Sequence, residues 1–336
     1  MHIGLVMAGD EEGGLEKHVV ELAAGLVTRG HQVSVIAHDK YRARLHPDIH
    51  FYAVNLAKSR RNLIVLFQLW YTLKQINADL VHAHGNKAAA MVGVVLRFLS
   101  LASVATLHSK KNKTQMFAPF DRVIAVSAIA ATTLSHPHVS VILNGIHPPP
   151  RLNVQRVQPP VVLAVGRLVA VKGFDVLLDA WRQVQPTAML WIAGEGSERR
   201  RLEQLIEQYS LSDRVKLLGE RDDINVLMQQ ASVHVISSHY EGGPYTLAEA
   251  LLVQTPVVAT QVGMAIDHLP AAYLSPINDP QALAARLNAA LADLERTQTD
   301  FAMAYQWAQQ RLTLDAMLTQ VEQVYRGVVP AQARGT

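Results

Sequence analysis

Residues 161–196, VVLAVGRLVAVKGFDVLLDAWRQVQPTAMLWIAGEG, predict the class of fold on their own. Two short apolar runs at 161–168 and 188–196 flank residues 172–184, which have the pattern of a helix. Strands that are almost wholly apolar are typical of a sheet covered on both faces, and parallel strands need a crossover connection, usually a helix. The stretch therefore predicts one strand–helix–strand unit of a parallel sheet.

The same alternation continues on both sides of this unit. Seven β-rich runs, several of them separated by helical stretches, fill residues 2–145, and three more strands with their helices follow up to residue 262. Between the two series, residues 147–160 contain five prolines and no periodic pattern, as expected of a linker. We therefore predict an α/β protein of two facing, doubly wound, Rossmann-like domains, with ligands in the crevice at the carboxyl ends of their strands.

The pattern also predicts domain boundaries. The first Rossmann-like domain is expected over residues 1–148, the linker over 149–160 and the second Rossmann-like domain over 161–305. The tail is helical in pattern, and residues 306–328 are expected to form a C-terminal helix that crosses back to the first domain.

Capping residues predict where two helices begin. Asp279 and Pro280 have the residue types of an N-cap and a first helical position, so a helix is expected to start there. Ser197, after the turn that contains Gly194 and Gly196, is expected to cap the helix that follows it.

Composition limits the classes of function. The chain has 336 residues, of which 49% are hydrophobic and 18% charged, so it can build two cores and is not a disordered chain. A formal net charge of +3 suits anionic small molecules or an anionic membrane surface. No dense basic stripe with interleaved aromatics is present, which argues against nucleic acid as a partner.

The chain contains no cysteine, and we expect neither a signal peptide nor a membrane span in it. The absence of cysteine excludes disulfides and thiolate metal sites and fits a reducing compartment. The first residues, MHIGLVMAGDEEGG, do not have the pattern of a signal peptide, and the longest apolar stretch is interrupted by Arg97 and Ser100. We expect a cytoplasmic protein.

Two strand-to-helix turns carry residues suited to an anion. Gly13 and Gly14 precede the first long helix, where backbone N–H groups and the helix dipole favour negative charge, although an ordinary tight turn is the simpler interpretation of the pair alone. Arg167 and Lys172 follow a strand and precede a helix. A guanidinium, which donates several hydrogen bonds in one plane, beside a compact ammonium group fits the two phosphates of a diphosphate. Two solvated surface cations would give the same pattern. The dinucleotide fingerprint G-x-G-x-x-G is absent.

Two acids eight positions apart follow a later strand. Glu241 stands before Gly242, Gly243 and Pro244, whereas Glu249 lies within an apolar helical run. A carboxylate among apolar residues is costly to bury unless it has a partner, so a structural hydrogen-bonded glutamate and a ligand-binding one are both open. Paired carboxylates also occur in glycosidases, but their separation in space cannot be read from the sequence.

Eight short motifs occur in order across both predicted domains: GG, HAHG, TLHS, NGI, VGRL…KG, AGEG, LLG…D and EGGPYTLAEAL…TPVVAT. In this order they resemble the retaining GT-B glycosyltransferases of family 4, over roughly residues 3–270. The resemblance implies the GT-B fold and a retaining, metal-independent, hexosyltransferase-type enzyme. Its co-substrate would be a nucleotide-diphosphate sugar, UDP- or GDP-sugar, with no cofactor and no metal. Its acceptor would be a glycan or lipid-linked molecule in cell-envelope polysaccharide or lipopolysaccharide core synthesis.

The resemblance also implies roles for single residues. Glu241 would contact the donor sugar near its reacting end, and Glu249 would hold the ribose hydroxyls of the nucleotide. His82 is expected to pack, whereas His84 is expected to line the crevice. The implied catalytic residues are His108, Arg167, Lys172 and Glu241. The implied donor-binding residues are Gly14, Arg167, Lys172, Gly194, Glu241, Gly242, Gly243 and Glu249. The acceptor-side residues are Gly13, His84, Asn86 and Lys110.

Two departures from the family pattern concern the sugar pocket. Gly243 stands where a large apolar residue is usual, and Gly263 stands alone where a pair of glycines is usual. Because both positions shape the sugar pocket, the resemblance does not specify the donor sugar.

Other classes of function remain open at this point. A GT-B nucleotide-sugar epimerase or phosphorylase would share the donor-site residues, and an epimerase would release a changed sugar nucleotide with no acceptor present. A non-catalytic partner subunit that binds a sugar nucleotide would retain the fold without turnover. The chain contains no strict Asp-x-Asp, so a bound metal is not needed to explain stabilisation of the leaving group.

One helical stretch is compatible with peripheral contact with the inner leaflet of a membrane. Lys58, Arg60 and Arg61 precede residues 62–76, a helix rich in Leu, Phe and Trp, and Lys110, Lys111 and Lys113 add basic charge in SKKNK. A core-facing helix with a solvated basic cap explains the same pattern.

Overall fold

A computed structural model describes residues 1–9, 13–241 and 245–329 and divides the chain into two compact units. The first unit consists of residues 1–145 together with the C-terminal segment that begins at Leu314, and the second consists of Ile146–Thr313. Residues 149–160, the predicted linker, contain no strand or helix and belong to the second unit. The same unit contains residues 306–313, the start of the predicted returning helix.

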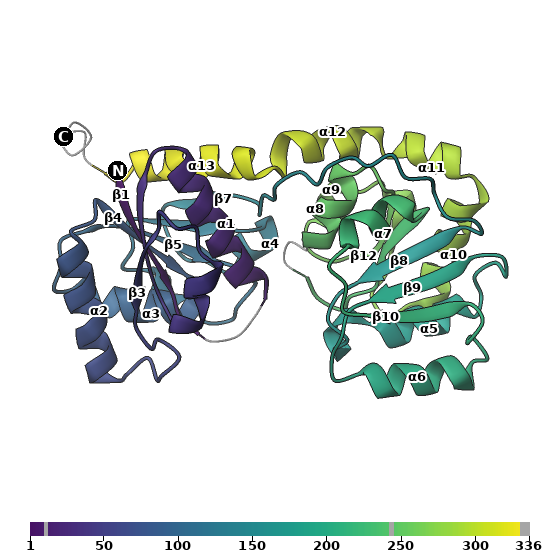
Figure 1. Ribbon diagram of the computed structural model, residues 1–336, viewed down its shortest axis with the longest axis horizontal. Coiled ribbons are helices and arrows are strands. Elements are labelled where there is room, and N and C mark those ends of the chain that lie inside the picture. The colour runs from purple at the N-terminus through teal and green to yellow at the C-terminus, as the bar shows by residue number, and fades with distance from the viewer. Residues whose placement is uncertain (10–12, 242–244, 330–336) are drawn as a thin grey trace. The chain divides into compact units, whose positions relative to one another are not determined.

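Within the described residues, the first unit is built on a seven-stranded parallel sheet with the order β3-β2-β1-β4-β5-β6-β7 (Figure 1). All seven predicted β-rich runs contain one of these strands, which confirms the strand predictions for this part of the chain. The strands are β1 (His2–Met7), β2 (Gln32–Ala37), β3 (His50–Ala53), β4 (Leu80–His84), β5 (Ala102–Leu107), β6 (Arg122–Ala125) and β7 (Val139–Val141).

Helices cover both faces of this sheet. Helices α1 (Gly14–Thr28) and α13 (Leu314–Arg326) share one apolar core with the strands, and α2 (Leu63–Ile76) and α3 (Gly85–Val95) share the other. The short elements of the unit are α4 (Ala128–Ala131) and the 3₁₀ turns η1 (Asp39–Arg44) and η2 (Gln115–Phe117).

The C-terminal helix α13 packs closely on α1. A Cβ atom at Gly25 would lie 2.5 Å from Leu318 Cδ1, so the absence of a side chain at Gly25 allows the two helices to approach. Arg29 forms an ion pair with Asp315 at 2.5 Å and another with Glu322 at 3.3 Å. These contacts place the C-terminal helix in the first unit, as the predicted fold class requires.

The second unit is built on a six-stranded parallel sheet among the described residues, with the order β10-β9-β8-β11-β12-β13 (Figure 1). Its strands are β8 (Val161–Val165), β9 (Met189–Ala193), β10 (Val215–Gly219), β11 (Val233–Ile236), β12 (Val257–Thr260) and β13 (Leu274–Ser275). Its helices are α5 (Phe174–Trp181), α6 (Arg199–Gln208), α7 (Ile224–Gln230), α8 (Tyr245–Leu252), α9 (Ala265–His268), α10 (Pro280–Ala292), α11 (Leu294–Asp300) and α12 (Ala302–Arg311), with 3₁₀ turns η3 (Ala170–Lys172) and η4 (Ala271–Tyr273).

One predicted helix cap is confirmed and the other is wrong. Asp279 accepts a hydrogen bond from the backbone N–H of Ala282 at 2.8 Å, with Pro280 in the first turn of α10. Helix α6 instead begins at Arg199, and the residue before it is Glu198 rather than Ser197. The Glu198 N–H donates to the Leu168 carbonyl at 2.9 Å, so the neighbouring loop holds this turn.

Both sheets have a point at which the strand order reverses. In the first unit β1 lies between β2 and β4, and in the second β8 lies between β9 and β11. At such a point the loops that leave adjacent strands diverge to opposite faces, which opens a ligand site at the carboxyl ends of the strands. No helix within the described ranges is long and apolar enough to cross a membrane.

Candidate active site

The reversal point of the second unit holds an ion pair between Lys172 and Glu241. Lys172 ends η3, which follows β8, and Glu241 follows β11, so the adjacent strands β8 and β11 deliver the two residues. Ser238 Oγ also donates to Glu241 Oε1 at 2.8 Å. The Lys172 and Glu241 side chains are 23% and 14% exposed, so the pair is largely shielded from water.

Backbone packing fixes Lys172 beside β11. Gly173 adopts φ +60°, and a Cβ atom there would lie 2.3 Å from the Ser237 carbonyl oxygen. Ser237 Oγ donates to the Lys172 carbonyl at 2.9 Å. A residue other than glycine at position 173 would force the two loops apart, so the KG motif sets the position of the cation. The sequence interpretation missed Ser237 and Ser238, although their place directly after an apolar strand was a usable signal.

Arg167 lies in the same loop as Lys172. The Lys172 side chain packs over Gly166, since a Cβ atom at Gly166 would lie 3.4 Å from Lys172 Cε. Arg167 is exposed, and its guanidinium has no hydrogen-bond or ion-pair partner among the described residues. The second unit thus presents a paired cation and an exposed one on one loop.

Gly194 has a structural role that the sequence interpretation did not distinguish from ligand binding. It adopts φ +139°, and a Cβ atom there would lie 2.0 Å from the Gly166 carbonyl oxygen. Its N–H donates to the Gly219 carbonyl at 2.7 Å, so this amide already has a partner within the protein. The loops after β8 and β9 therefore touch through their backbones at this glycine.

Of the other predicted donor-binding residues of this unit, the structure describes Glu249 but not Gly242 or Gly243. Glu249 lies in α8, partly buried, between the buried residues Ala248 and Ala250. It takes part in an interaction within the protein, so this carboxylate is not isolated. Gly242 and Gly243 lie outside the described residues.

A cluster of three histidines, His18, His84 and His108, lies at the carboxyl end of the first sheet; it is called the histidine cluster below. One ligand nitrogen from each ring lies within 4.8 Å of the others, and His84 Nδ1 is 3.3 Å from His108 Nε2. His18 comes from α1, and its ring meets that of His108 edge-on at 4.9 Å between centroids. The sequence interpretation missed His18, because a single histidine on an apolar helix face does not indicate a site.

Burial makes these histidines neutral at neutral pH. Desolvation lowers the pKa of His18 to about 4 and holds the pKa values of His84 and His108 well below 6.5, and the neighbouring rings add a further lowering for both. His84 Nε2 and His18 Nδ1 are buried and find no hydrogen-bond partner among the described residues. The histidine cluster can therefore bind a hydroxyl group or a metal ion without first losing a proton.

His82 packs inside the first unit, as predicted. It is fully buried, and its ring is hydrogen-bonded to Tyr325 Oη and Thr106 Oγ1, both at 2.7 Å. His84, predicted to line the crevice, is only 1% exposed, so its ring lies behind the surface. Tyr325 in α13 thus links the C-terminal helix to the strand that ends in His84.

The start of α1 is the predicted anion site of the first unit. Gly14 is the first residue of the helix, and Gly13 stands in the cap position with an extended backbone that has no side-chain hydrogen bond. Glu16, in the first turn, is 8% exposed and already places negative charge at this helix end. Residues 10–12 lie outside the described residues.

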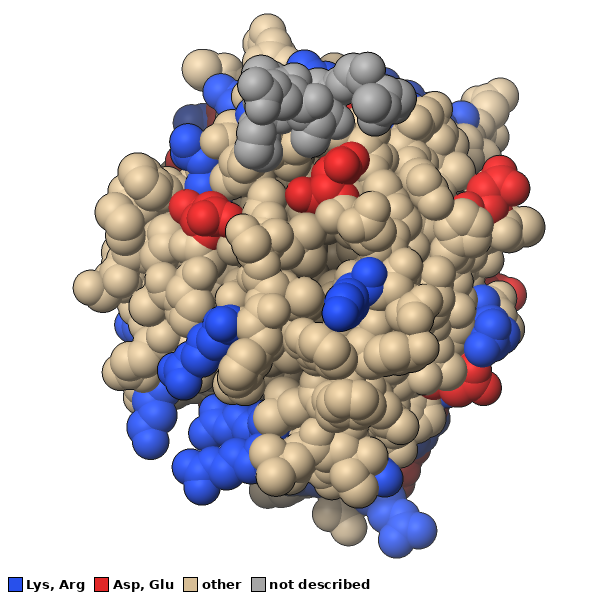
Figure 2. Space-filling model, turned by 90° about the vertical axis from the view of Figure 1, so that its left-hand side faces the viewer, with Lys and Arg blue, Asp and Glu red and all other residues tan. Residues whose placement is uncertain are grey.

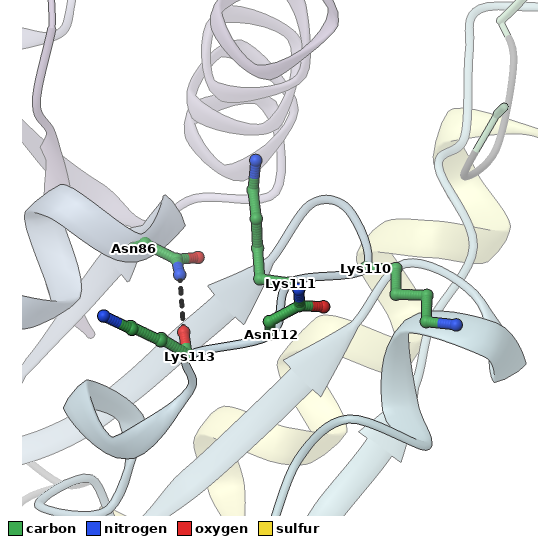
Figure 3. Close-up of a pocket in the computed structure, with 5 residues that line it drawn as sticks. All are labelled: Asn86, Lys110, Lys111, Asn112 and Lys113. Atoms are coloured by element: carbon green, nitrogen blue, oxygen red, sulfur yellow. Dashed lines mark hydrogen bonds between the residues drawn. The ribbon is translucent and has the colours of Figure 1, made fainter.

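Three lysines and two asparagines line an open hollow of about 370 Å³ in the first unit, which is called the lysine-lined hollow below (Figure 3). Asn86 Nδ2 donates to the Lys113 carbonyl at 3.0 Å, which joins the start of α3 to the loop after β5. Two predicted acceptor-side residues, Asn86 and Lys110, therefore line the same hollow, although Lys110 points away from Asn86 (Figure 3). The complete lining is Asn86, Lys110, Lys111, Asn112 and Lys113.

Two family models match the two halves of the chain. The family described as "Glycosyl transferases group 1" matches residues 152–304, and "Glycosyltransferase Family 4" matches residues 12–148. The chain belongs to the family 4, group 1 glycosyltransferases. The resemblance found in its motifs is therefore confirmed at the level of the family.

Two curated glycosyltransferases show sequence similarity to this chain, one over most of its length and one over a shorter stretch. A phosphatidylinositol N-acetylglucosaminyltransferase subunit of Homo sapiens is 26% identical over 295 residues, which cover 77% of this chain and 61% of that protein. The lipopolysaccharide core biosynthesis glycosyltransferase LpsE of Rhizobium meliloti is 36% identical over 102 residues, 30% of each chain. The chain thus spans less than two thirds of the human relative's length.

The fold of the chain matches that of a solved structure. HepE of Anabaena, in a crystal structure with UDP, superimposes with a TM-score of 0.83 at 21% identity, over 97% of this chain and all of that one. HepE has also been solved with UDP and glucose and with UDP-glucose. The two parallel sheets and this likeness identify the two-domain, Rossmann-like GT-B fold.

Proposed function

We propose that this glycosyltransferase moves a sugar from a UDP- or GDP-sugar to a glycan or lipid-linked acceptor, with retention of the anomeric configuration. The observation that carries the proposal is the Lys172–Glu241 pair, held at the reversal point of the second sheet on the loop that also presents Arg167. The UDP-glucose complex of HepE supports the donor class, and the name of LpsE supports a role in cell-envelope polysaccharide or lipopolysaccharide core synthesis. The reaction would take place in the cytoplasm, at the inner leaflet of the membrane.

The two cations act on the leaving group. Breaking the bond between the sugar and the diphosphate builds negative charge on the departing phosphate and positive charge on the anomeric carbon. Arg167 and Lys172 stabilise the negative charge most strongly in the transition state, and this difference lowers the barrier. Each charged hydrogen bond contributes roughly 1.5–3 kcal/mol, so the two cations suffice for leaving-group stabilisation without a metal ion.

Glu241 has two roles in this scheme. Its carboxylate holds the ammonium of Lys172 and accepts from Ser238, so the cation is already positioned before the donor enters. A carboxylate at this point also faces the side of the donor on which positive charge develops at the anomeric carbon, and it contacts the donor sugar there. Glu249, in α8, accepts hydrogen bonds from the ribose hydroxyls of the nucleotide.

The acceptor is held by residues of the first unit. Its hydroxyl oxygen forms the new bond to the anomeric carbon on the face from which the diphosphate leaves, and the hydroxyl proton passes to the departing phosphate oxygen. Asn86 and Lys110 contact the acceptor from the lysine-lined hollow, where an anionic acceptor is favoured. His108 is neutral at neutral pH because burial lowers its pKa, so it contacts the donor sugar as a hydrogen-bonding group and not as an acid.

The first test is a thermal-shift panel with UDP, GDP, ADP and CMP on the wild type, Lys172→Ala and Lys216→Ala. Lys216, in β10, is exposed and serves as the matched control lysine of the second unit. At about a hundred times Kd a ligand stabilises by roughly 2.7 kcal/mol, which raises Tm by a few degrees. We expect one diphosphate to stabilise the wild type and Lys216→Ala but not Lys172→Ala.

Transfer assays complete this test. Lys172→Ala should lower transfer at least tenfold, because a loss of about 1.4 kcal/mol in the transition state is sufficient. Normal turnover in Lys172→Ala would remove the diphosphate assignment. A changed sugar nucleotide released without any acceptor would identify an epimerase. A shift with a nucleotide but no transfer to any acceptor would favour the non-catalytic subunit, and no shift with any nucleotide would contradict the donor assignment.

A further inference from the structure

One face of α2 is apolar and exposed. Leu63, Ile64, Phe67 and Tyr71 are 80%, 71%, 62% and 51% exposed, and their spacing places them along one side of the helix. The opposite side of the same helix packs into the core of the first unit through Val65, Leu69, Leu73 and Ile76. A helix that is apolar on both sides is normally enclosed, so the exposed face has the composition of a contact surface.

The aromatic residues of this face suit a boundary between water and lipid. The Phe67 ring lies 5.6 Å from that of Trp70 and stacks on that of Tyr71 at 6.4 Å. Lys74 Nζ lies 5.2 Å above the Trp70 ring. Tyr71 and Lys74 are exposed and combine an apolar body with a polar end, so they suit the level of lipid headgroups, whereas Trp70 is partly buried against the core of the unit.

Basic charge is concentrated on the part of the chain that carries α2. Residues 49–120 contain nine lysines and arginines and a single acid, Asp79, whereas the rest of the chain contains 22 basic and 27 acidic residues. Exposed Lys58, Arg60 and Arg61 immediately precede α2. Figure 2 shows this side of the molecule, where uncharged side chains make up most of the visible face and Lys and Arg gather along its lower edge.

The basic segment before α2 also lies beside α3. Lys87 Nζ, in the first turn of α3, donates to the Ala57 carbonyl at 2.6 Å. Asn86, the residue before Lys87, lines the lysine-lined hollow. The contact between Lys87 and Ala57 therefore joins the basic segment to α3, the helix that also carries a lining residue of the hollow.

We propose that this face of α2, with the basic segment before it, docks on an anionic lipid bilayer. The apolar side chains enter the boundary between headgroups and acyl chains, and Lys58, Arg60 and Arg61 contact the anionic headgroups. A symmetric contact between two copies of the chain is less favourable, because it would bring these like charges together at the rim of the same patch. The docking depends on this surface and not on the donor site, so it would hold for a catalytically inactive chain.

Flotation with lipid vesicles tests the proposal without donor or acceptor. The wild type is mixed with vesicles of phosphatidylcholine alone or with about 30% phosphatidylglycerol, at low and at high salt. We expect the protein to float with the anionic vesicles, less at high salt and least with the neutral ones. Protein that stays at the bottom with anionic vesicles at low salt would overturn the proposal, while leaving the donor assignment untouched.

Three variants separate the apolar and the electrostatic contributions. Ile64→Gln with Phe67→Gln should lower vesicle binding more than tenfold at either salt concentration, because each large apolar side chain withdrawn from water contributes about a factor of ten or more. Arg60→Gln with Arg61→Gln should lower binding mainly at low salt. The control is Met303→Gln, which changes a residue of the second unit that is 83% exposed. Equal binding by the wild type and the Ile64, Phe67 variant would refute the assignment to α2.

Two further measurements identify what covers α2. Bromine atoms on the acyl chains should quench the fluorescence of Trp70, and Trp70→Phe should remove this quenching without removing flotation. Sedimentation in the absence of lipid should give a monomer. A dimer that dissociates in the Ile64, Phe67 variant would instead show that the face is an interface between copies of the chain and would overturn the proposal.

Discussion

Acidification should destabilise the first unit, because four of its buried histidines are neutral in the folded state. Desolvation lowers the pKa of His18 to about 4 and holds those of His82, His84 and His108 well below 6.5. The same side chains titrate near 6.5 in the unfolded chain. Below that pH the unfolded state therefore binds more protons than the folded one, and stability present above pH 6.5 is lost as the pH falls.

The size of this effect follows from the pKa values. Between pH 7.5 and 5.5, each histidine that stays neutral in the folded state lowers the free energy of unfolding by roughly 1 kcal/mol. Four such residues give a loss of several kcal/mol, which is a large part of the stability of many domains. Other side chains change charge little in this range, apart from the remaining histidines.

Urea unfolding at pH 7.5, 6.5 and 5.5 measures this loss. The first unit contains one of the four tryptophans, Trp70, so its fluorescence can be followed in a variant whose other tryptophans are phenylalanine. His82→Gln should reduce the pH dependence by roughly 1 kcal/mol. An equal free energy of unfolding at pH 7.5 and 5.5 would refute the assignment of buried, neutral histidines.

Two more outcomes are expected. Gly194→Ala should lower the free energy of unfolding by at least about 2 kcal/mol in urea titrations, because its Cβ would lie 2.0 Å from the Gly166 carbonyl oxygen at a φ of +139°. Gly93→Ala is the control that should be tolerated, because the nearest atom to its Cβ would lie at an ordinary 3.4 Å. A Gly194→Ala variant as stable as the wild type would contradict the packing described. Treatment with EDTA should leave sugar transfer unchanged, since the proposed reaction assigns stabilisation of the leaving group to Arg167 and Lys172. Activity lost on chelation and restored by Zn²⁺ would instead place a metal ion at the histidine cluster.

Most of the fold could be predicted because the buried parallel strands are nearly continuous apolar runs. The exceptions have local physical causes. β13 (Leu274–Ser275) is too short to show any period, so it was missed. The helical pattern that begins at Pro280 does not continue as one helix, because Asp293 accepts a hydrogen bond from the Arg296 N–H at 2.9 Å and starts α11. An aspartate inside a helical pattern can cap a new helix, and the sequence alone does not show which role it takes.

The candidate site could be predicted only in part, because its contacts join residues far apart in the chain. The motifs indicated Lys172 and Glu241 separately, but no spacing rule pairs residues from the loops of two different strands. The pairing depends on the adjacency of β8 and β11, which is a property of the strand order. His18 is a similar case, since its partners His84 and His108 come from two other elements.

The Lys172–Glu241 pair gives a physical reason why the motifs at these two positions belong together. A lysine held in a largely shielded position without a partner would lose hydration, and the same applies to an unpaired glutamate. Each side chain supplies the counter-charge of the other, and Ser238 satisfies a further lone pair of the carboxylate. In the proposed reaction, Lys172 would exchange part of its interaction with Glu241 for the phosphate oxygens of the donor, without any need to reposition its backbone, which Gly173 and Ser237 hold in place. The cation would then be oriented before negative charge develops on the leaving group, and such preorganisation makes an electrostatic contact effective in a transition state.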